Sequence, residues 1–347
     1  MMDIDTIYKV REVDAGQDKL IAEIEKFLNN NDLKLGKDVI KYLTISIGGE
    51  IVASAGIAEG GIIKCTAIHP NYRGEGLVLK LFTELTYLCF DLGFKDLFIY
   101  TKPENEKIFR NCGFFPIEIA SKVILMENSK TRLTNYCKDL QKINSRINAT
   151  KIGSVVLNAN PFTLGHQFLV ESAASLCDWL HVFVVKEDAS YFSWEDRFEL
   201  VNKGISHLKN VTLHEGSRYI ISRVTFPTYF LKDEKIADEN YAELDLRIFR
   251  HYIAPSLNIT HRFVGTEPTS PITNKYNSEM NYWLEEAPLA YPPIKTTIIE
   301  RKTVNSQPIS ASKVRELYLA DKMEELKLYV PPTTYEFLEK NKNVKNK

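Results

Sequence analysis

The second half of the chain alternates short apolar segments with longer segments of helical period, and this alternation restricts the fold more than any other feature. Apolar runs of strand length are each followed by a segment whose apolar residues recur on one helix face. Strands and helices alternating at this spacing predict βαβ units, that is, a parallel sheet covered by helices on both faces. We expect strands at 153–157, 180–185, 211–214, 260–264 and 295–299, and helices at 165–176, 194–203, 239–253, 272–285, 310–319, 323–328 and 333–339.

The first half follows a different pattern, in which several strands precede the helices. Two Gly-Gly pairs, at 48–49 and 60–61, separate β-rich runs, and glycine accepts the positive φ of tight hairpin turns. Antiparallel strands with a helix on either side are therefore predicted. The expected order is a helix at 17–30, strands at 42–47, 50–58 and 62–68, a helix at 75–92, a strand at 96–100, a helix at 105–112 and a strand at 114–126.

Length and the change of pattern predict two domains. The chain has 347 residues, more than one hydrophobic core usually supports. Residues 127–150 are polar and lysine-rich but carry an apolar stripe of helical spacing, which indicates a connecting helix. We expect a first domain at 1–127, the connecting helix at 128–150 and a second domain at 151–347.

Charge and cysteine content exclude several classes of protein. The 44 lysines and arginines are balanced by 45 aspartates and glutamates, so no overall positive charge favours a nucleic-acid partner. Five cysteines without a C-x-x-C pair disfavour both a disulfide framework and a cysteine metal site. The N-terminus lacks a signal-peptide pattern, and no apolar run is long enough to cross a bilayer. We expect a soluble cytoplasmic protein without a nucleic-acid partner, a membrane partner or a protein-bound metal.

The strand at 153–157 runs into a loop and a helix with the sequence NANPFTLGH. Ligands in open α/β sheets bind outside the carboxyl ends of the strands, and a helix N-terminus suits a phosphate. Gly165 would let a phosphate approach the backbone, and His166 would donate to a phosphoryl oxygen as charge develops. We predict ATP binding by Asn160, Pro161, Phe162, Thr163 and Gly165, with His166 as a catalytic residue.

A second anion site is expected roughly 150 residues further along, where ISASKVR opens another helix. Arginine offers a planar fork and lysine a point charge, and both suit phosphates. Ser310 and Ser312 are predicted to bind ATP, and Lys313 and Arg315 to be catalytic. One cradle for the α-phosphate and another for the β- and γ-phosphates would support in-line attack on the α-phosphorus, with pyrophosphate leaving.

The two motifs together resemble the (H/T)-x-G-H and I-S-S/A-T/S-x-x-R signatures of the nucleotidylyltransferase superfamily, which implies a Rossmann-like parallel sheet. Thr163 stands where many members have histidine. Residues 192–204 also resemble that superfamily, and this resemblance makes Arg197 a further ATP-binding candidate. Lys186, at a predicted strand end, is another candidate, although an exposed cation in such a place is often only a solvated charge.

Each motif alone has a common structural explanation, because Ser-x-Ser before a helix is usually an N-cap and Gly-His at a helix start is usually structural. Both motifs in this order, each at a strand-to-helix junction, favour a functional site.

Residues 67–90 carry a second resemblance, through Arg73-Gly74-Glu75-Gly76 before an amphipathic helix. This stretch resembles the R-G-x-G-x-G/A loop of the GNAT superfamily of N-acetyltransferases, which grips the pyrophosphate of acetyl-CoA. Val78 stands at the last small position of that loop, and residues 105–115 resemble a later helix of the superfamily. The first domain is therefore expected to have the GNAT fold, with a CoA-like arm bound near Arg73, Gly74, Gly76 and Asn105, or to serve only as a docking surface.

The two domains in this order resemble the citrate lyase ligase family over nearly the whole chain, and residues 185–192, 225–232 and 265–277 also fit that family. The resemblance implies that acetate attacks ATP to give acetyl-adenylate and pyrophosphate. The acetyl group then passes to the thiol of the dephospho-CoA-derived prosthetic group on the acyl-carrier subunit of citrate lyase, and AMP is released. Mg²⁺ would bridge the phosphates of ATP, held mainly by them and by water.

Other functions remain open at this point. A nucleotidyltransferase acting on a phosphorylated small molecule would carry the same two motifs. An aminoacyl-tRNA-synthetase-like enzyme is disfavoured, because no basic RNA-binding extension and no K-M-S-K-S motif occur. A non-catalytic adaptor for a carrier protein would not need both phosphate cradles.

Overall fold

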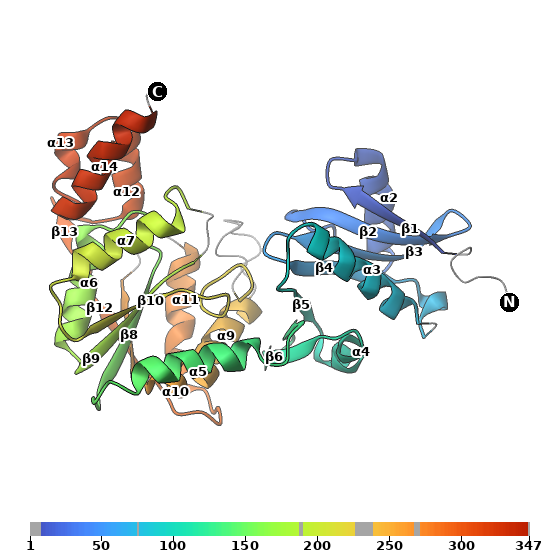
Figure 1. Cartoon of the computed structure of the whole chain (residues 1–347), viewed down its shortest axis with the longest axis horizontal. Coiled ribbons are helices and arrows are strands. Elements are labelled where there is room, and N and C mark those ends of the chain that lie inside the picture. The colour runs from blue at the N-terminus through green and yellow to red at the C-terminus, as the bar shows by residue number, and fades with distance from the viewer. Residues whose placement is uncertain (1–7, 75, 187–189, 226–238, 267–270, 346–347) are drawn as a thin grey trace. The chain divides into compact units, whose positions relative to one another are not determined.

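The computed structural model describes residues 8–74, 76–186, 190–225, 239–266 and 271–345 (Figure 1). The chain divides into two compact units, Met1–Leu133 and Thr134–Lys347. Helix α5 (Arg132–Asn144) spans the end of the first unit and the start of the second. Its residue Leu140 is buried in a core cluster of the second unit, so α5 packs as part of that unit along most of its length.

The N-terminal unit is built on one seven-stranded sheet with the strand order β1-β2-β3-β4-β5-β7-β6. Strands β4 and β5 run parallel, whereas the other neighbouring strands are antiparallel. The strands are β1 (Lys9–Asp14), β2 (Val39–Ile47), β3 (Glu50–Ala58), β4 (Ile62–Ile68), β5 (Phe98–Thr101), β6 (Phe115–Ile119) and β7 (Ile124–Glu127).

Helices α2 (Asp18–Asn29) and α3 (Leu77–Asp91) cover opposite faces of this sheet. Successive residues of β2 separate the two faces: Tyr42 lies in the cluster that contains Ile24 of α2, and Leu43 lies in the cluster that contains Leu81 of α3. Because successive side chains of a strand point to opposite faces of the sheet, β2 contributes residues to both cores. Shorter elements complete the unit: η1 (Pro70–Tyr72), η2 (Pro103–Asn105) and α4 (Glu106–Asn111).

The structure of this unit differs from the prediction in two places. Strand β1 was not predicted, because it is a charged edge strand in which Val13 alone is buried. The single strand predicted at 114–126 is a hairpin of β6 and β7, closed by a bond from the Ala120 amide to the Val123 carbonyl at 2.8 Å. The turn contains no glycine, so the sequence carried no strong turn signal there.

The C-terminal unit contains a five-stranded parallel sheet with the order β10-β9-β8-β11-β12. The strands are β8 (Ile152–Leu157), β9 (Trp179–Val184), β10 (Val211–Glu215), β11 (His261–Gly265) and β12 (Lys295–Ile299). The order reverses between β8 and β11, and such a switch point opens a crevice at the carboxyl ends of the strands. The predicted architecture, an α+β unit with a mostly antiparallel sheet followed by a Rossmann-like parallel sheet, is confirmed.

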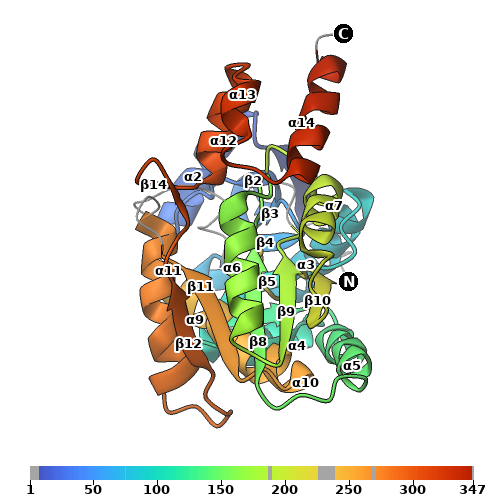
Figure 2. The same cartoon turned by 90° about the vertical axis from the view of Figure 1, so that its left-hand side faces the viewer.

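Both faces of the parallel sheet are covered (Figure 2). Val155 and Val182 pack into a cluster with α6 (Leu164–Ser175) and α7 (Trp194–Ile205), and Ile152 and Phe183 pack into a cluster on the other face. That second cluster draws on α5, α9 (Glu239–Ile248), η4 (Phe249–Ile253), α10 (Ala254–Leu257), α11 (Pro271–Asn281) and η5 (Tyr282–Glu286). The helices predicted at 239–253 and 272–285 form in the structure, and the last residues of each predicted range adopt a π-helical turn.

The last part of the chain forms a small helical layer with its own core. Helices α12 (Ala311–Leu319), α13 (Met323–Leu326) and α14 (Pro332–Lys345) bury Val314, Leu326 and Leu338 together with Phe192. A short hairpin, β13 (Thr303–Val304) and β14 (Gln307–Pro308), leads into this layer and was not predicted from the sequence. Among the described residues, no helix combines the length and hydrophobicity that crossing a bilayer requires.

Candidate active site

The loop between β8 and α6 begins at the switch point of the parallel sheet. Ala159 has a positive φ of 49°, and the Asn160–Pro161 peptide is cis. The Asn160 side-chain oxygen accepts a bond from the Phe192 amide at 3.1 Å, which ties this loop to the one before α7. The loop thus delivers Thr163 to the N-cap position of α6 with its side chain buried.

Thr163 and His166 form a reciprocal cap at the N-terminus of α6. The Thr163 hydroxyl accepts a bond from the His166 amide at 3.3 Å, and the Thr163 amide donates to His166 Nδ1 at 3.1 Å. The hydroxyl also lies 2.9 Å from Nδ1. Because Nδ1 accepts from the Thr163 amide, the proton of the neutral ring is on Nε2. The cap therefore selects the tautomer that presents an N–H donor at its far edge.

The environment of His166 keeps its ring neutral. Burial, and to a lesser degree the positive charge of Arg301, lower the pKa of His166 to about 4. The ring also stacks on Phe162, with centroids 5.9 Å apart and planes at 17°. His166 is therefore a fixed neutral donor near neutral pH, suited to stabilising charge on a phosphoryl oxygen without itself transferring a proton.

The second predicted motif folds against the first. Ser310 caps α12, accepting from the Lys313 amide at 3.2 Å. Arg315, one turn further on, donates from Nη2 to Ser312 Oγ at 3.0 Å and from Nη1 to the Asn160 carbonyl, 155 residues away in the sequence. The guanidinium thus joins the two helix N-termini, and its partial burial lowers the pKa of Arg315 from the ordinary value.

Gly165 has a packing role that the sequence did not reveal. A Cβ at this position would lie 3.3 Å from both Cβ and the carbonyl oxygen of Ile309, the residue before the α12 cap. Glycine therefore permits close contact between the start of α6 and the segment leading to α12. The prediction explained this glycine by the close approach of a phosphate. The contact with Ile309 is a second, separate reason for a glycine here.

Arg197 was predicted to contact ATP, but its guanidinium faces the protein interior. The residue is 0% exposed, and its Nη1 donates to the Asn158 carbonyl at 2.8 Å, to Asn158 Oδ1 at 3.0 Å and to the Val185 carbonyl at 2.8 Å. Nε donates to the Phe192 carbonyl at 3.3 Å. These bonds hold the loops after β8 and β9 together beneath the carboxyl edge, which gives Arg197 a structural role, and contact with ATP stays a prediction.

Phe162 and Lys186, two further residues predicted to bind ATP, lie in different surroundings. Phe162 is fully buried in the core below α6, and a Cβ on Gly204 of α7 would lie 2.3 Å from its ring, so the side chain is a core element. Lys186 is exposed at the end of β9, where Nζ pairs with Glu215 at 2.9 Å and lies 5.0 Å from the centroid of the Trp194 ring. Lys313 pairs with Glu316 at 2.9 Å, which raises the pKa of the lysine.

Arg301 is the site residue that sequence reasoning missed. It follows β12 at the carboxyl edge, and its Nε donates to the Thr266 carbonyl beyond the end of β11. Its charge acts on His166 across the switch point. The available signal was position, because a basic pair, Arg301-Lys302, comes one residue after the end of a predicted strand.

The loop that resembles a pyrophosphate grip has open space over its glycines. Gly74 and Gly76 have φ values of 89° and 74°, and a Cβ on either would meet nothing within 4 Å. Arg73 Nε donates to the Ile68 carbonyl at 3.3 Å, and Val78 packs against the core rather than into the loop. Asn105 donates to Thr101 Oγ1 at 3.0 Å at the end of β5. Glu75 lies outside the described residues.

Other predicted family stretches fall partly outside the described residues, namely 187–189, 226–232 and 267–270. Within the described part of the chain, no group of three or more His, Cys, Asp or Glu side chains is placed to hold a metal ion.

Comparison with known proteins shows which family the chain resembles. Residues 152–338 match the model of the citrate lyase ligase C-terminal domain. The chain is 47% identical to the "[Citrate [pro-3S]-lyase] ligase" of Escherichia coli (strain K12), over 94% of this chain and 92% of that protein. It is 49% identical to the protein of the same name from Klebsiella pneumoniae, over 91% of each chain. It is also 49% identical to that from Haemophilus influenzae, over 93% of this chain and 96% of that protein. With both predicted motifs meeting at the carboxyl edge and similarity extending over both units, the chain belongs to the citrate lyase ligase family.

Proposed function

We propose that this chain activates acetate with ATP and transfers the acetyl group to the thiol prosthetic group on the acyl-carrier subunit of citrate lyase. The observation that carries the proposal is the bond from Arg315 to the Asn160 carbonyl. It brings two helix N-termini, those of α6 and α12, to one end of the parallel sheet. The names of the related proteins support citrate lyase as the protein acted upon.

The first step is attack of a carboxylate oxygen of acetate on the α-phosphorus of ATP. A new P–O bond forms, the bond to the bridging oxygen of the β-phosphate breaks, and pyrophosphate leaves with the electron pair of that bond. The carboxylate is already an anion, so no protein group has to remove a proton. Catalysis then consists of alignment and neutralisation of charge, as in other phosphoryl transfers.

The described residues divide this work between them. The neutral His166 donates from Nε2 to an oxygen of the α-phosphate, because the Thr163 cap fixes its ring in that tautomer. Ser310 and Arg315, at the start of α12, bind the β- and γ-phosphates that become pyrophosphate. Lys313 adds a mobile charge at the same helix end. Mg²⁺ neutralises the phosphate oxygens when it is bound with ATP.

Other residues act by positioning these groups. Arg197 holds the carbonyls of Asn158 and Val185 and so fixes the loops that bear the site. Arg301 adds positive charge near His166 and discourages protonation of its ring. It is also a further candidate for contact with the nucleotide, because its guanidinium suits a phosphate.

The second step is attack of the thiolate of the prosthetic group on the acetyl carbonyl of acetyl-adenylate. A thioester forms, and AMP leaves. The loop of Arg73, Gly74 and Gly76 in the N-terminal unit is proposed to hold the phosphate-bearing part of that arm. The open space over both glycines and the N-terminus of α3 suit a phosphate.

Exchange of labelled pyrophosphate into ATP tests the first step without the carrier. Exchange that needs both Mg²⁺ and acetate supports reversible formation of acetyl-adenylate. Exchange supported by a phosphorylated small molecule and not by acetate would replace the proposal with an ordinary nucleotidyltransferase.

The carrier protein provides the second arm of the test. ATP binding without exchange, followed by exchange on addition of the deacetylated carrier subunit, would mean that the active site is completed by docking. Failure to bind ATP at all would leave a carrier-protein adaptor as the function.

A further inference from the structure

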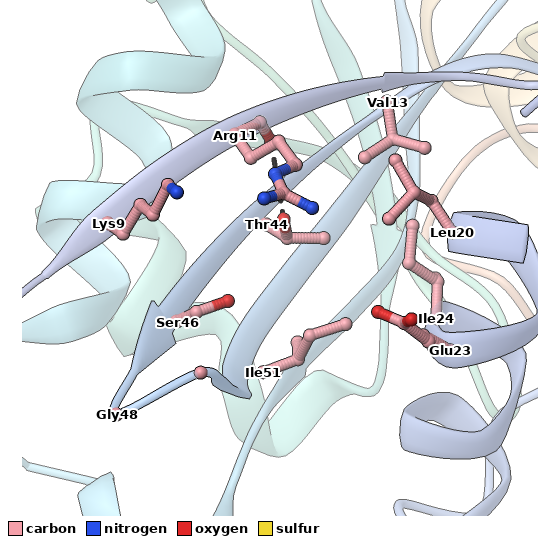
Figure 3. Close-up of a pocket in the computed structure, with 11 residues that line it drawn as sticks. Lys9, Arg11, Val13, Leu20, Glu23, Ile24, Thr44, Ser46, Gly48 and Ile51 are labelled. Atoms are coloured by element: carbon pink, nitrogen blue, oxygen red, sulfur yellow. Dashed lines mark hydrogen bonds between the residues drawn. The ribbon is translucent and has the colours of Figure 1, made fainter.

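A cavity of about 280 Å³ lies in the N-terminal unit between β1, β2 and α2 (Figure 3). The side chains of Lys9 and Arg11 project from β1 on one side, and Glu23 of α2 projects from the other. The tip of the β2–β3 hairpin, Gly48 and Gly49, closes one end. No residue of the cavity belongs to the nucleotide site or to the loop proposed to hold the prosthetic arm.

The cavity and that loop lie on opposite faces of the same sheet. Val13 and Ile24 line the cavity and belong to the core cluster beneath α2. Leu77, the first residue of α3 after the glycine loop, belongs to the cluster on the other face. A ligand in the cavity would therefore be separate from a ligand held at the N-terminus of α3.

Three charged side chains of the cavity lack partners within the described part of the chain. Lys9, Arg11 and Glu23 form no ion pair or side-chain hydrogen bond with any residue that the structure describes. Lys41, by contrast, on the adjacent strand, pairs with both Glu12 and Asp14. Two cations against one carboxylate leave a charge of +1 directed at the cavity.

The remaining lining separates into a polar and an apolar side. Ser46 lies on β2 close to Lys9, and the Thr44 hydroxyl donates to the Arg11 carbonyl at 3.3 Å. Opposite them, Leu20, Ile24 and Ile51 offer aliphatic surface. A ligand needs an anionic end for the first side and a hydrocarbon body for the second.

We propose that this cavity binds an aliphatic monocarboxylate. Lys9 and Arg11 lie two residues apart on one face of β1, about 7 Å along the strand, so one carboxylate can lie between their charged ends. Glu23 repels a second carboxylate, and the net charge of +1 matches a single negative charge. The volume lies just below the lower end of the roughly 300–1,000 Å³ range of drug-sized pockets, which favours a small ligand.

Binding of hexanoate to the full-length protein tests the proposal, measured by saturation-transfer NMR and isothermal titration calorimetry in the absence of ATP. A ligand of this size is expected to have a dissociation constant on the order of 1 mM. Replacing both cations, in the Lys9→Met/Arg11→Met variant, should weaken binding about tenfold. The Lys95→Gln variant, which removes an exposed lysine elsewhere in the same unit, is the matched control and should bind like the unaltered chain.

The dicarboxylate of the same length, adipate, tests the role of Glu23. The unaltered chain should bind adipate more weakly than hexanoate, and Glu23→Gln should remove that preference while hexanoate binding persists. No hexanoate binding at about 50 mM, fifty times the expected constant, overturns the site. Equal binding by the double variant overturns it too, and an unchanged preference in Glu23→Gln overturns the charge match. These measurements do not involve ATP, so their failure would leave the proposed acetylation activity untouched.

Discussion

Replacing His166 by asparagine separates the two tasks of this side chain. The Oδ1 atom of asparagine can occupy the place of Nδ1, which accepts from the Thr163 amide at 3.1 Å, so the cap on α6 is retained. The variant has no counterpart of the outward Nε2–H donor. Loss of one such donor to a developing oxyanion typically reduces the rate by about 10²–10³, equivalent to about 2.7–4 kcal/mol.

The expected result for His166→Asn is therefore a loss of about 10²-fold or more in acetate-dependent pyrophosphate exchange. The ATP dissociation constant and the free energy of unfolding should change little, because a retained cap avoids the typical cost of about 1 kcal/mol. His166→Ala, which loses both tasks, should lose the same activity and in addition some stability.

Exchange kinetics, ATP titration calorimetry and urea unfolding measure the three quantities. A rate loss below about tenfold would contradict the donor role, since it is far less than such a donor contributes. An equal loss of ATP affinity would instead assign His166 to ground-state binding. Since its pKa is about 4, the pH profile of the unaltered enzyme should show no step from His166 near its ordinary value of 6.5.

Three further predictions follow from contacts within the C-terminal unit. Gly204→Ala should destabilise the unit by about 1–3 kcal/mol, because its Cβ would overlap the buried Phe162 ring, while the KM for ATP stays near the original value. Arg315→Lys should reduce exchange about tenfold or more, since lysine cannot contact the Asn160 carbonyl and Ser312 through one planar fork. His181 and His214 form a buried pair 2.8 Å apart, with pKa values lowered by burial to about 3 and about 4. Below their ordinary value near 6.5 the unfolded chain takes up protons that the folded chain does not, so stability should fall with falling pH, by up to about 1.4 kcal/mol per histidine per pH unit.

Matched variants control these experiments. Gly16→Ala, with open space around the added Cβ, should leave stability almost unchanged, unlike Gly204→Ala. For the histidine pair, urea unfolding from about pH 7 to pH 5 should show a shallower slope in the His181→Leu/His214→Leu variant than in the unaltered chain. Equal slopes in the double variant and the unaltered chain would refute the assignment to the buried pair.

Much of the fold follows from period and turn chemistry. The strands β8 to β12 were predicted within one or two residues. The signal is clearest for β8 and β9, because a strand buried on both faces leaves a nearly continuous apolar run. Edge strand β1 and the hairpin of β13 and β14 left no such signal. In the latter, Asn305 and Ser306 adopt positive φ values of 51° and 62° without a glycine.

The candidate site divides in the same way. The sequence by itself determined that two cap-forming motifs exist, because Thr163 with His166 and Ser310 with Lys313 interact within one helical turn. It also determined which residue types near these caps can bind a phosphate. These interactions depend on local spacing, which the sequence states directly.

Only the tertiary structure decided which side chains face the carboxyl edge. Whether an arginine lies under a loop, as Arg197 does, or joins two helix ends, as Arg315 does, depends on contacts between segments far apart in the chain. The position of Arg301 beside His166 depends likewise on the order of the strands in the sheet. Spacing along the chain carries no information about such contacts, because they arise when the sheet brings together the carboxyl ends of strands that are distant in sequence.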